Sequence, residues 1–99
     1  MIRVSVMYPS EQGKRFDFDY YATKHGALIR QKLEPVGLVR LKSDKAVDAT
    51  SPFAAIGHMY FNSLEEFQNG FFAHAAEFAE DLPNFTDIAP QLQVSEIFT

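Results

Sequence analysis

The sequence predicts a small α+β domain in which four strands and two helices follow the order βαββαβ. Residues 1–8 and 91–98 alternate in the way that half-buried strands do. Residues 53–61 form an almost continuous apolar run, which is typical of a strand covered on both faces. Two further stretches repeat apolar residues three and four positions apart after a capping residue, as amphipathic helices do.

The first helix is expected to begin after Asp17, because aspartate is a favourable N-cap residue. Phe16 and Tyr21 flank this cap at the spacing of a hydrophobic staple. Apolar positions then follow one helix face as far as Leu33. The Pro-Val-Gly sequence at residues 35–37 ends the helix.

The middle of the chain predicts a short edge strand, a polar loop, the apolar strand and a second helix. The edge strand is expected at Val36–Lys42 and the loop at Ser43–Pro52. After the apolar strand, Ser63 lies three residues before Glu66, which is the spacing of a capping box. Residues 81–87 end the second helix and lead to the last strand.

This order corresponds to the ferredoxin-like arrangement, a four-stranded antiparallel sheet with both helices on one face. The other face then stays uncovered, and its expected residues are mixed rather than uniformly polar. They include Arg3, Ser5, Met7, Gln91, Gln93 and Ser95. A face of this kind is usually closed by a second sheet, so we expect a homodimer through the open sheet face. A monomer with a hydrated face is the alternative.

Composition limits the function classes. Ninety-nine residues fit one domain, here residues 1–99, and a hydrophobic content of 46% excludes disorder. The net charge of −4 and the lack of a basic cluster argue against nucleic-acid binding. No apolar run could span a membrane, and the start of the chain does not resemble a signal peptide. The chain has no cysteine, so a cytoplasmic protein without disulfides or thiolate chemistry is expected.

The three histidines of the chain are the catalytic candidates. His25, His58 and His74 all fall at positions that the patterns predict to be buried or half-buried. Histidine changes charge near neutral pH, so such a position among aromatic rings suits proton transfer. A core histidine bonded to a backbone carbonyl is the alternative for each. A zinc site is less favoured, because no two of them have local ligand spacing.

Other chemistries have little support in the sequence. There is no nucleophile elbow, dinucleotide fingerprint or phosphate-binding loop. Tyr21 lies on the predicted core face, where its hydroxyl needs a partner or the mouth of a pocket. Haem binding through one histidine is the weakest alternative, because nothing would hold the propionates.

Two stretches, RFDFDYYATKH and AIGHMYFNSLEEFQNGFFAHAAEFAEDLPNFTDIAPQLQVSEI, together with the opening MIRVSVMYP, resemble the EthD family. That family is named for a gene of ethyl tert-butyl ether degradation. The resemblance implies a dimeric α+β barrel and an oxidoreductase-type activity without an assigned mechanism. The positions that it implies are His25 in YYxxKH, His58 in GHMYF, His74 in FxxHA and Asp87 in NFTDI. Related barrels include cofactor-free cyclases, lactone isomerases, quinol monooxygenases and haem enzymes.

These observations lead to the hypothesis of a small enzyme acting on an apolar or aromatic metabolite in a degradative pathway. His25 and His58 would act as acid and base, and His74 would orient them. Tyr21, Phe71 and Asp87 would contact the substrate. A reductase would also need electrons from a cofactor or partner that the sequence does not identify. The alternative is a non-catalytic carrier or accessory protein of such a pathway.

Overall fold

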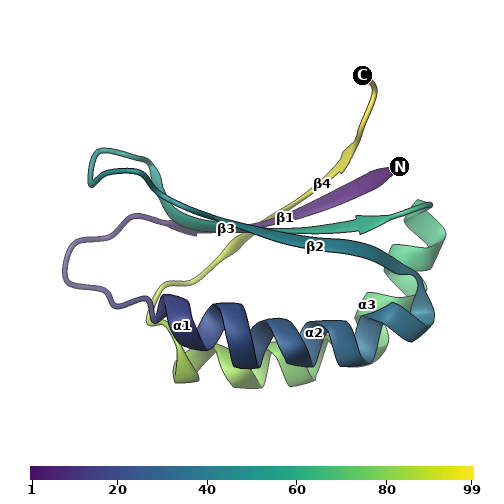
Figure 1. Cartoon of the computed structure of the whole chain (residues 1–99), viewed down its shortest axis with the longest axis horizontal. Coiled ribbons are helices and arrows are strands. Elements are labelled where there is room, and N and C mark those ends of the chain that lie inside the picture. Colours follow the sequence, from purple (N-terminus) through teal and green to yellow (C-terminus); the bar gives the residue numbers. More distant parts are fainter.

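Four strands form one antiparallel sheet in the order β2-β3-β1-β4, as expected for the ferredoxin-like arrangement. The computed structural model describes all 99 residues. The strands are β1 (Ile2–Pro9), β2 (Leu38–Lys45), β3 (Phe53–Phe61) and β4 (Gln91–Glu96). Figure 1 shows all the helices beneath one face of this sheet, which confirms the predicted α+β architecture.

The first predicted helix consists of three consecutive segments. A short α1 (Phe18–Tyr20) leads into a π-helical turn (Tyr21–His25) and then into α2 (Gly26–Leu33). The second predicted helix is α3 (Leu64–Asp81). Single 3₁₀ turns follow α2 and α3 at Glu34–Val36 and Leu82–Asn84. Each helix is too short or too polar to cross a lipid bilayer.

The predicted helix starts are confirmed. The Asp17 side chain accepts a hydrogen bond from the backbone N–H of Tyr20 at 3.0 Å, and the Phe16 and Tyr21 rings lie 5.2 Å apart across this cap. At the start of α3, Ser63 Oγ accepts a hydrogen bond from the backbone N–H of Glu66 at 3.1 Å. Local sequence therefore determines where both helices begin.

The predicted bounds of the edge strand were wrong. Glu34–Val36 forms a 3₁₀ turn instead, which ends at Gly37 with a left-handed φ of 117°. The strand then runs to Lys45, because Lys45 still pairs with Ala55 on β3. Pairing with β3 thus extends the strand into a polar segment that has little strand propensity of its own.

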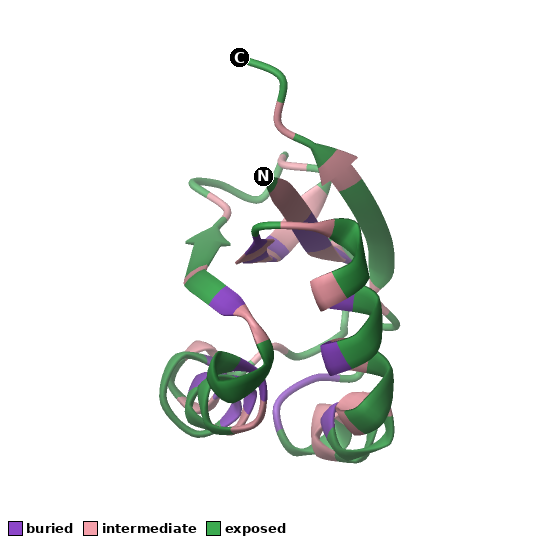
Figure 2. Ribbon diagram, turned by 90° about the vertical axis from the view of Figure 1, so that its right-hand side faces the viewer, coloured by how far each residue is buried: buried purple, intermediate pink, exposed green.

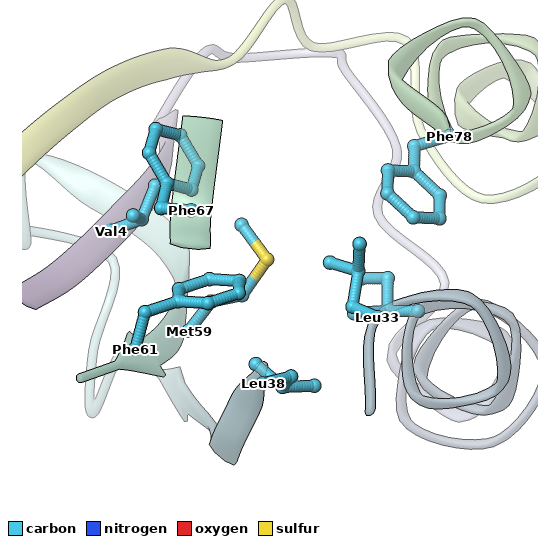
Figure 3. Close-up of a cluster of buried hydrophobic side chains, with 8 residues drawn as sticks. Val4, Leu33, Leu38, Met59, Phe61, Phe67 and Phe78 are labelled. Atoms are coloured by element: carbon cyan, nitrogen blue, oxygen red, sulfur yellow. The ribbon is translucent and has the colours of Figure 1, made fainter. Parts of the chain in front are cut away.

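Side chains alternate between the two faces of the sheet. On β3 the odd-numbered residues from Ala55 to Phe61 are buried, whereas the even-numbered ones are only half-buried. Figure 2 shows the buried residues gathered on the inside of the molecule and the exposed ones on the outer sides of the helices. The main core joins α2 and α3 to the strands β1, β2 and β3. Figure 3 shows its side chains converging from these elements. This core comprises Val4, Ile29, Leu33, Leu38, Met59, Phe61, Phe67 and Phe78.

A second, aromatic-rich cluster fills the end of the domain near the π-turn. It contains Tyr8, Tyr21, Ala55, Phe85 and Ile88. The sheet face opposite the helices, here called the open face, is covered by no element of the chain (Figure 1). Cross-strand pairs Arg3–Tyr60, Ser5–His58 and Met7–Ile56 lie on it. Titratable side chains that were predicted for the site therefore lie on both sides of the sheet.

Candidate functional site

A cavity of about 250 Å³ lies between the sheet and the two helices. Twelve of its 15 lining residues are hydrophobic, and none is a lysine, arginine, aspartate or glutamate. The lining includes residues of α3 and of β4, among them Leu92, which is 50% exposed. An apolar, largely preformed space of this kind is the usual setting for a small-molecule site.

His25 brings a titratable group to the cavity wall. It ends the π-turn, and its side chain is only 5% exposed. Its Nδ1 lies 2.8 Å from Oδ2 of Asp81, the last residue of α3. The Asp81 side chain is itself 14% exposed. The cavity is therefore lined by a histidine that is bonded to a half-buried carboxylate.

Two more side chains hold the carboxylate of Asp81. The Tyr20 hydroxyl donates to Oδ1 at 2.7 Å, and Asn84 Nδ2 donates to the same oxygen at 2.9 Å. Burial alone would raise the pKa of Asp81, but the hydrogen bonds from Tyr20, Asn84 and His25 together outweigh it and lower that pKa. Asp81 is consequently ionised at neutral pH.

The π-turn explains how residues five apart can share one carboxylate. In an α-helix of 3.6 residues per turn, Tyr20 and His25 would point in clearly different directions. Here the backbone N–H of Gly26 donates to the carbonyl of Tyr21, a π-type bond that inserts one residue into the turn. Tyr20 and His25 therefore both reach Asp81. Turns of this type are frequent at functional sites.

The rings around His25 favour its neutral form. Phe85 lies 4.6 Å from the imidazole, and Tyr21 is stacked on it at 5.5 Å with an interplanar angle of 24°. Burial lowers the pKa of His25, and the hydrogen bond and charge of Asp81 oppose this only in part. An ionised carboxylate can only accept, so Nδ1 carries the proton and Nε2 carries the lone pair.

The second ring nitrogen of His25 has no partner within the chain. Nε2 makes no hydrogen bond within the chain. The one buried side-chain atom that lacks a partner is Arg3 Nε, so His25 Nε2 is not sealed inside the protein. Nε2 is therefore a hydrogen-bond acceptor and potential base at the wall of the cavity.

Two buried tyrosines also line the cavity. Burial is the main cause that raises the pKa of Tyr8, and Tyr21 beside it adds to this shift. Burial likewise raises the pKa of Tyr21, although the hydroxyls of Ser43 and Tyr8 oppose it. Both phenols are therefore protonated at neutral pH. Gly57 makes room for Tyr21, because a Cβ at this position would overlap the tyrosine hydroxyl oxygen.

Of the six site residues predicted from the sequence, the structure brings His25, Tyr21 and Phe71 together around the cavity. His58 is instead on the open face. Its Nδ1 lies 3.3 Å from Ser5 Oγ, and its Nε2 lies 2.8 Å from Asp44 Oδ2. The strand alternation that buries Met59 beneath the helices turns His58 to the opposite side of the sheet.

His74 and Asp87 also lie outside the cavity lining. His74 Nδ1 is 3.3 Å from Glu77 Oε1 on α3, and its side chain is 25% exposed. Asp87 is 55% exposed and lies 3.6 Å from Arg15 Nε at the surface. The three histidines thus do not converge on one site, and His25 alone borders the cavity.

Sequence reasoning missed Asp81 and its donors Tyr20 and Asn84. A signal for Asp81 was present, because the helix face that carries Phe71, His74 and Phe78 continues three residues later at Asp81. The function of Tyr20 had no such signal, because the π-turn that aligns it with His25 has no clear sequence pattern. No three His, Cys, Asp or Glu side chains lie together in a metal-binding arrangement.

The comparisons with known proteins agree with this fold. A family model of the EthD domain matches residues 11–89. The crystal structure of an EthD-like protein from Ralstonia eutropha JMP134 is 35% identical, with a TM-score of 0.89, and the match covers 99% of this chain and 92% of that one. An ethyl tert-butyl ether degradation (EthD) family protein from Bacillus halodurans C-125 is 20% identical, with a TM-score of 0.70 and 99% of both chains covered.

A more distant structure shares the fold alone. It is a dimeric protein of unknown function with a ferredoxin-like fold from Bacteroides fragilis NCTC 9343, 6% identical, with a TM-score of 0.62 and 97% and 95% of the two chains covered. None of the curated proteins matches the sequence. The family model covers most of the chain, and the match to the Ralstonia protein covers almost all of it. The chain therefore belongs to the EthD family.

Proposed function

We propose that this EthD-family protein is a small enzyme that performs acid/base chemistry at His25 on an apolar or aromatic metabolite of a degradative pathway. The observation that carries the proposal is the His25–Asp81 pair at the wall of an apolar cavity. An apolar cavity bordered by titratable groups with perturbed pKa values is the usual form of a small-molecule active site. The family's link to ether degradation supports the pathway class.

The proposed step is a proton transfer between substrate and His25. Nε2 accepts a proton from the bound substrate, and the carboxylate of Asp81 stabilises the imidazolium that forms. Tyr21 and Phe71 form part of the wall that excludes water from this step. His58, His74 and Asp87 have no role in it, because they lie outside the cavity lining.

An oxidoreductase-type reaction is compatible with this step. Removing a proton from a substrate makes it more electron-rich and easier to oxidise. The oxidant or reductant would have to be a second substrate, a bound cofactor or a partner protein. The proposal therefore assigns the proton transfer to His25 and no cofactor to the chain.

We further propose that the protein is a cytoplasmic homodimer that associates through the open face. The chain leaves this face uncovered, although it carries Met7, Ile56 and Tyr60. Arg3 Nε is buried there without a hydrogen-bond partner, which a second copy could supply. A Bacteroides protein of similar fold is dimeric, which supports a dimer without indicating which face forms it.

The second candidate function is a non-catalytic carrier. It is favoured by the lining of the cavity, which is apolar except for His25 and the tyrosine hydroxyls. A carrier would bind the same class of molecule without converting it. The two functions differ in what happens to a bound ligand and in whether His25 is needed.

The test is turnover of a panel of phenols, hydroquinones and enolisable ketones, followed by mass spectrometry in air and under nitrogen. His25→Gln removes the base, and His74→Gln is the matched control, because His74 lies outside the cavity lining. Conversion that is lost in H25Q and retained in H74Q supports the proposal. Binding without conversion in the wild type overturns it in favour of the carrier.

A further inference from the structure

We infer that the cavity binds an uncharged aromatic molecule with a free hydroxyl group, and that this hydroxyl donates a hydrogen bond to Nε2 of His25. The inference rests on the proposed function, since it names the substrate class of the same site. It requires three properties of the cavity: a fixed acceptor, the absence of positive charge, and the size of an aromatic ring with substituents.

The acceptor is fixed by three donors to one carboxylate. Tyr20 and Asn84 occupy Oδ1 of Asp81 at 2.7 and 2.9 Å, which leaves Oδ2 for His25 at 2.8 Å. Asp81 can donate no proton, so Nδ1 must be the donor of this pair. Nε2 then carries the lone pair of an imidazole that lines the cavity. Its complementary ligand group is an O–H or N–H, and a carbonyl or ether oxygen would leave it unpaired.

The charge of the lining selects against ionised ligands. No lysine or arginine borders the cavity, and Asp81 places a negative charge behind His25. A carboxylate or phosphate would lose its hydration there and gain no cation in return. A phenol enters as a neutral molecule and becomes negative only as its proton passes to Nε2, when the imidazolium balances the charge.

The volume and lining suit an aromatic ring. A cavity of about 150 Å³ can hold benzene, and this one measures about 250 Å³. It can therefore take a ring with substituents. Tyr21, Phe71 and Phe78 supply aromatic surfaces, which favour edge-to-face or offset contacts with such a ring. The hydroxyl then sets the orientation, because His25 Nε2 is the free acceptor among these side chains.

Three matched ligands test the inference: 4-methylphenol, 4-methylanisole and 4-methylacetophenone. All are uncharged and similar in shape, but only the first has a hydroxyl donor. Binding to the full-length protein is measured by calorimetry, and the state of His25 by the ¹⁵N shifts of its ring. We expect 4-methylphenol to bind roughly tenfold to a hundredfold more tightly than 4-methylanisole, because the ether leaves Nε2 desolvated and unpaired.

Asp81→Asn should exchange the donor and acceptor nitrogens of His25 without removing the histidine. Tyr20 and Asn84 still donate to the amide oxygen of residue 81, so its NH₂ group takes the place of Oδ2. That NH₂ donates to Nδ1, and the ring proton moves to Nε2. The preference for 4-methylphenol over 4-methylacetophenone should then disappear or invert. H74Q, the control, should keep the wild-type order.

The outcomes separate the inference from the proposed function. Equal or tighter binding of 4-methylanisole or 4-methylacetophenone by the wild type overturns the inference, and so does a complete lack of binding with unchanged His25 shifts. A phenol preference that D81N abolishes supports it. If that preference holds but the turnover assay shows no conversion, the substrate class stands and the enzyme proposal fails.

Discussion

The imidazole of His25 is subject to two opposing influences. Burial among Tyr21 and Phe85 disfavours its positive charge, while Asp81 favours it. Burial is the larger influence, so the free protein holds a neutral base. When a proton arrives at Nε2, the same Asp81 stabilises the cation that forms. A base that is neutral at rest and supported when charged suits proton transfer near neutral pH.

The first prediction concerns the pKa of His25. In the wild type it should lie below the ordinary value of about 6.5. Asp81→Asn should lower it further, because the substitution removes the negative charge that raises it. Titration of the ring nitrogens by NMR measures both values, with H74Q as the control. A His25 pKa that stays the same or rises in D81N would contradict the assigned role of Asp81.

The second prediction is a loss of stability in acid with two contributions. The pKa of His25 is lowered in the folded state, so the unfolded chain takes up its proton first. The contribution of His25 to the free energy of unfolding therefore falls as pH drops below about 6.5. The pKa of Asp81 is also lowered, so its stabilising effect is present above about 3.9 and is lost as pH falls through the folded-state value.

Urea denaturation between pH 3 and 8 measures this effect in the wild type and in H25Q. The first loss, below about pH 6.5, should be absent from H25Q, because that variant has no imidazole to protonate at residue 25. The loss of stability that comes from protonation of Asp81 should remain in H25Q, because Tyr20 and Asn84 still donate hydrogen bonds to that carboxylate. Identical pH profiles for the two proteins would contradict the lowered pKa of His25.

Among single residues, the sequence could predict His25 as a candidate base, but it could not predict the side chains that hold its ring. Helical spacing predicts that His25 and Tyr21 lie on a buried face, and the predicted substrate contacts Tyr21 and Phe71 line the same cavity as His25. His58 and His74 have equally suggestive patterns, yet strand alternation and the edge of a helix face direct them elsewhere. Asp81 is 56 residues from His25 in the chain, and such a contact depends on how α3 packs against α2.

Among the elements, the π-turn matters most for the site. It lets Tyr20 and His25 share Asp81, although Tyr20 does not line the cavity. Tyr20 is thus a positioning residue that acts on His25 through the carboxylate. Its hydroxyl also draws part of the negative charge of Asp81 away from the imidazole.

The third prediction follows from this arrangement. Tyr20→Phe should raise the pKa of His25, because the Asp81 carboxylate then has one donor fewer and interacts more strongly with Nδ1–H. Tyr60→Phe is the matched control, since Tyr60 lies on the open face. NMR titration of His25 separates this effect from simple destabilisation, which would lower the unfolding midpoint and leave the pKa unchanged.

The fourth prediction concerns the close approach of the first helix and β3. Gly57→Ala places a Cβ where it overlaps the Tyr21 hydroxyl oxygen and should destabilise the protein by about 1–3 kcal/mol. Gly26→Ala is the control. Its Cβ would lie 3.4 Å from the nearest atom, and the change improves helix propensity. Urea denaturation compares the two, and equal stability of G57A and the wild type would exclude a tight contact between Tyr21 and β3.

The elements also show what sequence patterns can predict. Phe53–Phe61 and the capped start of α3 could be located, because a strongly apolar run and a Ser-x-x-Glu cap are local signals. The start of β2 could not, because Glu34–Val36 turns before the strand begins. Its end depends on pairing with β3 and not on the polar residues of the segment itself.

For the molecule as a whole, the sheet separates two different polar sites. His25 and Asp81 lie on the helix side, beside the cavity. On the open face, His58 bonds both Ser5 and Asp44, and Ser5 is only 8% exposed even in a single chain. In the proposed homodimer this face becomes the interface. The histidine of the open face would then serve association and the histidine of the cavity would serve chemistry.

The last prediction tests this division of roles. Ile56 pairs with Met7 near the middle of the open face, so Ile56→Asp would place an unpaired charge inside a sheet-to-sheet interface. We expect the wild type to sediment as a dimer and I56D as a folded monomer, with native structure checked by circular dichroism. Val47→Asp is the control, because Val47 is 94% exposed and lies outside the sheet. A wild type that sediments as a monomer at micromolar concentration would contradict the dimer, whereas the cavity and its phenol preference would still stand, because every residue of that site comes from one chain.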